Sequence, residues 1–270
     1  MLKDITIGQY IPGDSFVHKL DPRTKIILTI LYVINLFLVG KLYGYIFSII
    51  FLAAAIIVSK VPFKFIYKGL KPIFLLIVIT SVFNIFMIKG TPETLIWKWK
   101  FFEIYQNGVV MAIKMVLRLI LLIMGTSLMT LTTSPIEITD GIENLLNPLK
   151  KIKFPAHELA MMMSIALRFI PTLIDETDKI MKAQKARGAD FESGNIMQKA
   201  KSLIPLLVPL FISSFRRADE LAMAMEARCY RGGNGRTRMK RLKYTSKDAI
   251  AYVGIVILIC ATVLLRIGII

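Results

Sequence analysis

Five long apolar runs, separated by polar segments, are the feature that most limits how this chain can fold. A helix that crosses a bilayer needs about 17–25 predominantly apolar residues. Hydrophobic residues make up 55% of the 270-residue chain, which is high for a soluble domain. The sequence therefore predicts an all-α integral membrane protein with about five transmembrane helices. The runs are residues 25–39, 42–59, 72–88, 108–133 and 249–265.

The positive charge of the chain is distributed between these runs. The formal net charge is +17, but the lysines and arginines do not form one basic domain that would bind nucleic acid. In membrane proteins they concentrate in cytoplasmic loops. Here they gather near the N-terminus, at residues 60–71 and throughout residues 134–247. We therefore expect a cytoplasmic N-terminus, a cytoplasmic segment at residues 134–247 and an extracellular C-terminus.

The cytoplasmic segment contains two apolar pieces that resemble spans. Residues 159–174 are interrupted by Arg168 and Pro171, and residues 203–215 are short and contain two prolines. Both are shorter than a spanning helix needs, so we expect kinked helices at the inner membrane surface. The predicted parts are a membrane domain with the first four spans, a cytoplasmic helical domain and the last transmembrane helix, at residues 1–133, 134–247 and 248–270.

Two helical segments of the cytoplasmic domain end in nearly the same way. The sequences are Ala183-x-x-Ala186-Arg187-Gly188 and Ala224-x-x-Ala227-Arg228-Cys229. In each, an alanine and the arginine four residues later share one helix face. An arginine at a single helix end could serve only to complement the helix dipole, which contributes about 0.3–1 kcal/mol. The repetition favours a second interpretation, in which the two arginines belong to a two-pronged connector.

Arg118, one turn after Lys114, is the strongest anomaly in the predicted spans. A charge near the bilayer centre costs about 2.5–3.5 kcal/mol on insertion scales, so such residues usually have a function. The alternative is that the side chain extends toward the outer interface, since the fourth span is long. The sequence leaves both interpretations open.

The sequence lacks the motifs of the common catalytic and metal-binding sites. It has no P-loop; residues 232–236 are glycine-rich but lack the P-loop lysine and following helix, and we expect a turn there. It has no H-E-x-x-H or G-x-S-x-G motif. Its two cysteines and two histidines indicate neither a disulfide framework nor a metal site. We therefore expect no enzymatic activity and no cofactor.

Several motifs resemble those of one membrane-transport family, and the resemblance covers nearly the whole chain. They are Ile11-Pro12-Gly13-Asp14-Ser15 with His18-x-Leu20-Asp21-Pro22-Arg23, Thr132-Thr133-Ser134-Pro135-x-Glu137, Glu158-Leu159-Ala160 through Ser164-Ile165-Ala166-Leu167-Arg168-Phe169-Ile170-Pro171-Thr172-Leu173, and the two Ala-Arg helix ends. With these motifs the chain resembles the T component (EcfT family) of energy-coupling factor transporters.

The resemblance implies a non-catalytic subunit of the prokaryotic cytoplasmic membrane. In that family the T component couples two ABC-type ATPases to a small substrate-binding membrane subunit, the S component, for vitamin or transition-metal uptake. It implies that the two helix ends dock on the ATPases through Ala186, Arg187, Gly188, Ala227, Arg228 and Cys229. Cys229 departs from the family's Ala-Arg-Gly signature, which puts the need for glycine in doubt but not the role of the arginine.

The resemblance also implies a surface for the S component on the apolar faces of the same helices. The candidate residues are Met161, Met162, Ile165, Phe169, Leu206 and Leu210. The alternative function is a permease subunit of a conventional ABC importer, which would usually offer one coupling loop and form its own substrate path. A membrane enzyme acting on lipid or isoprenoid substrates would need a cluster of acids or histidines at the cytoplasmic face, and the sequence has none.

Overall fold

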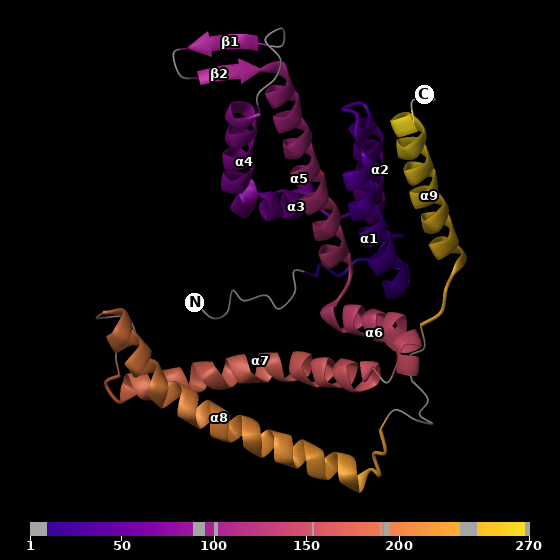
Figure 1. The fold of residues 1–270 in the computed structure, drawn as a ribbon. Helices are drawn as coiled ribbons and strands as arrows, with labels where there is room; N and C mark the ends of the chain where they lie inside the picture. Colours follow the sequence, from indigo (N-terminus) through magenta and orange to yellow (C-terminus); the bar gives the residue numbers. More distant parts are fainter. Residues whose placement is uncertain are drawn as a thin grey trace. The chain divides into compact units, whose positions relative to one another are not determined.

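The computed structural model describes residues 10–88, 95–99, 102–152, 154–189, 191, 195–232 and 242–267. Most of these residues are helical, which confirms the predicted all-α membrane class (Figure 1). The chain divides into two compact units. We call them the membrane unit, Gly8–Asn144 with Arg241–Ile270, and the helix-pair unit, which is centred on Leu145–Lys240.

The membrane unit has seven helices among the described residues, and all but α3 and α6 correspond closely to a predicted span. They are α1 (Pro22–Leu38), α2 (Gly44–Ser59), α3 (Phe63–Leu70), α4 (Phe74–Met87), α5 (Gln106–Thr132), α6 (Pro135–Leu146) and α9 (Ser246–Ile267), with a 3-10 turn at Lys71–Ile73 between α3 and α4. The helix-pair unit contains a 3-10 helix at Asn147–Ile152, α7 (Ala156–Ala186) and α8 (Ile196–Ala227).

Among the described residues, four helical stretches are long and apolar enough to cross a membrane. They are Phe63–Met87, Gln106–Thr132, Ala156–Ala186 and Ser246–Ile267, and Gly44–Ser59 is a shorter apolar helix. Ala156–Ala186 is among them because α7 continues through Arg168 and Pro171 as one helix. Sequence reasoning treated this stretch as an interrupted, shorter piece. Length and composition therefore do not by themselves separate α7 from the spans.

The core of the membrane unit lies between α1, α2, α5 and α9. One cluster of buried apolar side chains joins these four helices: Tyr32, Leu36, Val39, Tyr45, Leu52, Leu121, Ile255 and Leu258. A polar contact runs through it, because the buried Asn35 accepts from Thr262 Oγ1 at 2.6 Å and its Nδ2 lies 3.4 Å from Ser48 Oγ. Gly125 allows α5 to approach α1 closely, since a Cβ there would lie 2.5 Å from Tyr32 Cε1.

The segment before α1 folds against the C-terminal end of α5. Ile11 N–H donates to Leu131 O at 2.9 Å, and the His18 ring lies 3.0 Å from Ile11 O and 2.6 Å from Ser15 Oγ. Lys25 is 4% exposed, and its ammonium donates to His18 O at 3.1 Å and Thr132 O at 2.8 Å. The last carbonyl of α5, which has no partner inside its own helix, is thereby satisfied by a buried cation.

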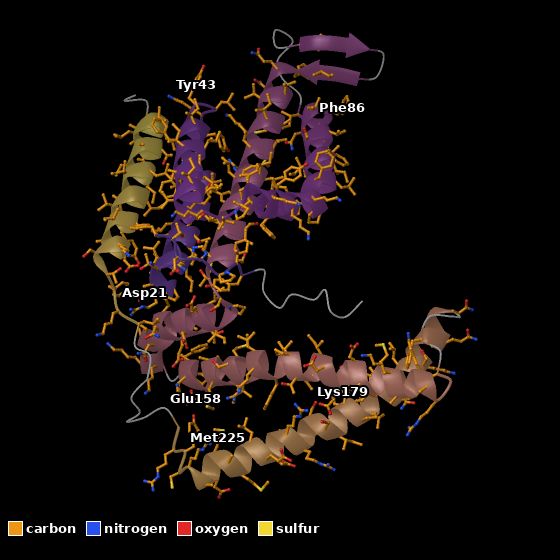
Figure 2. The ribbon with its side chains drawn as sticks, turned by 180° about the vertical axis from the view of Figure 1, so that it is seen from behind. Asp21, Tyr43, Phe86, Glu158, Lys179 and Met225 are labelled. Atoms are coloured by element: carbon orange, nitrogen blue, oxygen red, sulfur yellow. The ribbon has the colours of Figure 1, made fainter. Side chains whose placement is uncertain are left out.

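The same end of the membrane unit holds the start of α9. Asp21 caps α1, with Pro22 at the first helical position as the sequence predicts, and Asp21 N–H donates to Asp248 Oδ1 at 2.9 Å. Asp248 is 1% exposed and also accepts from Thr245 N–H at 2.7 Å. Asp21 and Tyr43 mark opposite ends of the unit in Figure 2. The chain therefore leaves α5 and returns to α9 at one anchored end.

Two elements were not predicted. An antiparallel hairpin pairs β1 (Leu95–Trp99) with β2 (Phe102–Tyr105) between α4 and α5. Its alternating β-branched and aromatic residues explain the strands. Helix α6 begins with a capping box, because Ser134 and Glu137 exchange two hydrogen bonds of 3.3 Å. Residues 233–236 of the expected glycine-rich turn lie outside the described residues.

Arg118 contacts side chains on either side of the turn between α1 and α2. Its Nε donates to the hydroxyl of Tyr45, which is 1% exposed, at 3.3 Å, and its guanidinium lies 5.2 Å from the centre of the Phe37 ring. One turn earlier, Lys114 Nζ donates to Gly40 O at 2.7 Å. Because α1 and α2 are 17 and 16 residues long and α5 is 27, their turn lies opposite the middle of α5. Arg118 therefore has polar and aromatic partners within the bundle.

We expect Arg118→Leu to lower the free energy of unfolding of the subunit by about 1–3 kcal/mol, because the buried Tyr45 hydroxyl loses its partner. Thermal unfolding in detergent measures this change. Tyr45→Phe is the matched variant, and once it is in place Arg118→Leu should have a smaller effect, because the shared contact is already gone. Equal melting temperatures for the wild type and Arg118→Leu would show that the arginine only extends toward the interface.

Candidate functional site

Helices α7 and α8 form a pair that is held by polar contacts. Arg217 on α8 donates to Glu176 on α7 at 2.7 Å, and both side chains are largely covered. Nearer the end of α7, Gln184 Nε2 lies 3.5 Å from Pro205 O. In Figures 1 and 2 the helices cross near the C-terminal end of α7, by Lys179, and diverge toward the labelled Glu158 and Met225. The crossing therefore lies late in α7 and early in α8.

The end of α7 is a Schellman motif, in which a residue in left-handed conformation reverses the chain. Gly188 has φ +87°, its N–H donates to Lys185 O at 3.0 Å, and Ala189 N–H donates to Gln184 O at 3.0 Å. Arg187 is the last residue before this reversal, with φ −86° and ψ 6°. The guanidinium is thus carried at the edge of an ordered helix end.

The end of α8 repeats this geometry. Cys229 N–H donates to Glu226 O at 2.8 Å and Tyr230 N–H donates to Met225 O at 3.0 Å. Arg228 has φ −89° and ψ 10°, nearly the values of Arg187. Cys229 takes the left-handed position with φ +55°, although this conformation favours glycine. The two sequence-predicted ends therefore present their arginines from the same backbone conformation.

Both arginine ends are accessible in the chain. The six residues that the sequence selects for docking are all exposed: Ala186, Arg187, Gly188, Ala227, Arg228 and Cys229. Within the described part of the chain, neither guanidinium makes a hydrogen bond or an ion pair, and a Cβ added to Gly188 would lie within 4 Å of no other atom. The ends therefore contribute little to the packing of their own unit.

The two arginine ends lie far apart along the helix pair. Arg187 follows Gln184, which touches α8 at Pro205, whereas Arg228 caps the opposite end of α8. At about 1.5 Å per residue, the helix from Pro205 to Arg228 is roughly 35 Å long. The structure does not bring the two ends together at one site.

The apolar surface of the pair differs from the predicted set. Met162 is 54% exposed, whereas Met161, Ile165, Phe169 and Leu210 are half-buried. Leu206 is only 5% exposed and offers no surface to a partner. The predicted stretch 203–215 also contains exposed side chains at helical spacing that the six candidates leave out: Ile204, Val208, Phe211, Ile212 and Phe215. Their spacing of i, i+4, i+7, i+8 and i+11 places them on one face of α8.

The described residues contain no group of three or more His, Cys, Asp or Glu side chains that could hold a metal ion. The polar groups of the helix pair instead connect the two helices, as Glu176 and Arg217 do, or lie on the surface. The arrangement offers exposed cations on ordered helix ends and an exposed apolar face. These are features of a surface that binds other proteins.

Comparison with known proteins agrees with this geometry. A model of the family described as "Cobalt transport protein" (CbiQ) matches residues 13–239. A relative from Clostridium kluyveri is 66% identical over 267 residues, which are 99% of this chain and 98% of the relative. A second from Ruminiclostridium cellulolyticum is 59% identical over 265 residues, 98% of each chain. A third from Bacillus subtilis is 51% identical over 266 residues, 98% of this chain and 100% of the relative.

All three relatives carry the name energy-coupling factor transporter transmembrane protein EcfT. The family match covers α1 to α8 with both arginine ends, and the relatives extend over α9 as well. The chain therefore belongs to the EcfT family, the transmembrane proteins of energy-coupling factor transporters.

Proposed function

We propose that the chain is the coupling subunit that links two ABC-type ATPases to a substrate-binding S component for uptake of a vitamin or other micronutrient. The observation that carries this proposal is the pair of like arginine ends. Each is exposed, each has the same Schellman geometry, and each lies at the C-terminal end of its helix, α7 or α8. The subunit itself is not an enzyme. Family membership disfavours the alternative of a conventional importer permease.

Each arginine end is suited to a groove on an ATPase. Arginine keeps its charge when buried and donates in a fixed fork that matches a carboxylate. The alanines at positions 183 and 224 lie on the same helix face as the arginines and leave room for a partner's backbone. Two separate ends require two like grooves, which two ATPase subunits would supply.

The exposed apolar face of α8 is our candidate surface for the S component. Ile204, Val208, Phe211, Ile212 and Phe215 are 51–69% exposed, and a contiguous apolar face of this kind marks an interaction surface. Movement of the ATPases would displace the arginine ends, and the Glu176–Arg217 pair would keep α7 and α8 together during this displacement. The S component on the apolar face would then be reoriented.

We place the helix pair on the cytoplasmic side. α7 carries Arg168 within its apolar half and several acidic and basic residues in its second half, and α8 carries charges at both ends of its apolar stretch. Charged residues of this density disfavour a lipid-spanning position. With α1, α2, α4, α5 and α9 as the spans, the N-terminus is cytoplasmic and the C-terminus extracellular.

The double variant Arg187→Ala with Arg228→Ala should fold and insert but lose its ATPases. If each guanidinium meets an acidic group away from water, truncation costs about 2–5 kcal/mol of association at each end, because the partner's charge is stranded. Loss at one end alone corresponds to a roughly 30-fold or larger fall in affinity. Pull-down of the ATPases by tagged subunit, with substrate uptake measured in the same cells, tests this.

Lys182→Ala with Arg216→Ala is the matched control, because it removes two exposed cations from the same helices. Surface charges of this kind contribute about 0–1 kcal/mol, so ATPase retention should stay near the wild-type value. Wild-type retention and uptake by the Arg187→Ala, Arg228→Ala variant would assign both arginines to helix capping alone.

Cys229→Gly separates the backbone of the helix end from the role of its arginine. Glycine adopts positive φ without strain, so the exchange should stabilise the end of α8 by up to about 1 kcal/mol and slow hydrogen exchange at the Tyr230 amide. The reverse exchange, Gly188→Cys, should speed exchange at the Ala189 amide. The Gly188→Cys side chain would not clash with its surroundings, because nothing lies within 4 Å of the added Cβ. ATPase retention should be unchanged in Cys229→Gly; a loss would mean that the thiol itself takes part in docking.

The proposed orientation predicts opposite results for two reporter fusions. A reporter that is active only in the cytoplasm should be active when fused after Ser134, at the end of α5, and silent when fused after Ile270, because α9 then carries it across the membrane. Strong activity after Ile270 would show that the number of spans is wrong by one.

A further inference from the structure

The membrane unit contains an apolar cavity between α1, α2, α5 and α9. Its volume is about 270 Å³. Its walls include Tyr32 from α1, Phe51 from α2, Leu128 from α5 and Gly254 from α9, and Phe16 from the segment before α1 also lines it. The cavity lies entirely within one unit. It is separate from the arginine ends and from the apolar face of α8, so the proposed function does not use it.

The few polar residues of this cavity are already engaged by backbone carbonyls. Lys25 Nζ donates to His18 O and Thr132 O, Thr29 Oγ1 donates to Lys25 O at 2.8 Å, and Thr132 Oγ1 donates to Leu128 O at 2.8 Å. The Tyr32 hydroxyl donates to Leu121 O at 3.4 Å. A site for a polar ligand needs polar groups that converge on it. This cavity offers walls of hydrocarbon instead.

A cavity of this kind is unfavourable both when it is filled with water and when it is empty. A water molecule needs two to four polar partners, and an apolar cavity of about 150 Å³ stays dry and binds benzene. The present cavity is larger. Leaving it empty would deprive its walls of packing contacts. Its occupant is therefore expected to be a hydrocarbon group.

The cavity opens toward lipid between two spans. Three residues line the cavity and are also exposed: Ala54 and Val58 on α2, and Ile250 on α9. Val58 is 44% exposed and Ile250 is 63% exposed. The α2 and α9 helices pack against each other in the same unit, and α9 stands beside α1 and α2 in Figures 1 and 2. The hydrocarbon that lies next to such an opening is the acyl region of the bilayer.

We propose that this cavity is a binding site for one acyl chain of a membrane phospholipid. The chain enters between α2 and α9 and lies against Tyr32, Phe51 and Leu128. Its contacts replace those that the helices do not make with one another. The bound lipid thereby closes the gap beside α9, the helix that follows the helix-pair unit in the chain.

The test uses the full-length subunit in bilayers that contain a phospholipid with a photoactivatable diazirine in its acyl chain. After irradiation, mass spectrometry maps the labelled residues. We expect labelling to concentrate on cavity residues such as Phe51 and Met129. It should exceed by about tenfold the labelling of Ile57, a 75% exposed residue of α2 outside the cavity. Even labelling of all three would indicate annular lipid only and overturn the proposal.

Two neighbouring alanines of α2 give a matched pair of variants. Ala54 lines the cavity, whereas Ala53 is exposed and does not. Native mass spectrometry should detect one retained phospholipid on the wild type and on Ala53→Phe, and about tenfold less on Ala54→Phe, because the ring occupies the acyl site. Ala251→Leu, which adds less volume from α9, replaces Ala54→Phe if that variant does not fold. Wild-type lipid retention by either filling variant would refute the site.

Discussion

The buried ammonium of Lys25 joins the elements that meet at one end of the membrane unit. It donates to the Thr132 carbonyl at the negative end of α5 and to His18 O in the turn before α1. A buried cation is tolerated only when its donors are satisfied, so α1, α5 and the turn are fixed together. Asp248 joins α9 to the same end through Asp21 N–H. As a result, the end of α5 and the start of α9 are both held at this end of the membrane unit.

The two units differ in how much of their apolar side-chain surface they bury within themselves. The membrane unit has a continuous apolar core across four helices. By contrast, the buried residues of α7 are Ala156 and Ala160 alone, and α8 leaves Phe211 and Phe215 more than 60% exposed. Two helices above thirty residues with so little shared core depend on partners to cover them. This is the surface that the proposed contacts with the ATPases and the S component would cover.

Long apolar runs made the helices of the membrane unit predictable, because hydropathy is a local property: the predicted fourth and fifth spans differ from α5 and α9 by three residues or fewer at each end. They did not separate α7 from the spans. The capping box at Ser134 was available in the sequence and would have revealed α6. Leu206 could not be placed, because residues 203–215 are apolar on several faces and only packing decides which one turns inward. The role of Arg118 also needed the structure, since nothing local indicates that Tyr45 and the α1–α2 turn lie opposite the middle of α5.

The ends of α7 and α8 share one backbone conformation although their sequences differ. Gly188 and Cys229 have different costs in the left-handed region, yet both adopt it and both give the same hydrogen bonds. The arginine before each has nearly the same φ and ψ. Two helices of different sequence therefore present a guanidinium from the same backbone conformation. A helix that only needed its dipole complemented could do so with any cation in its last turn. Repeating the whole end is the outcome expected when two similar surfaces must each recognise it.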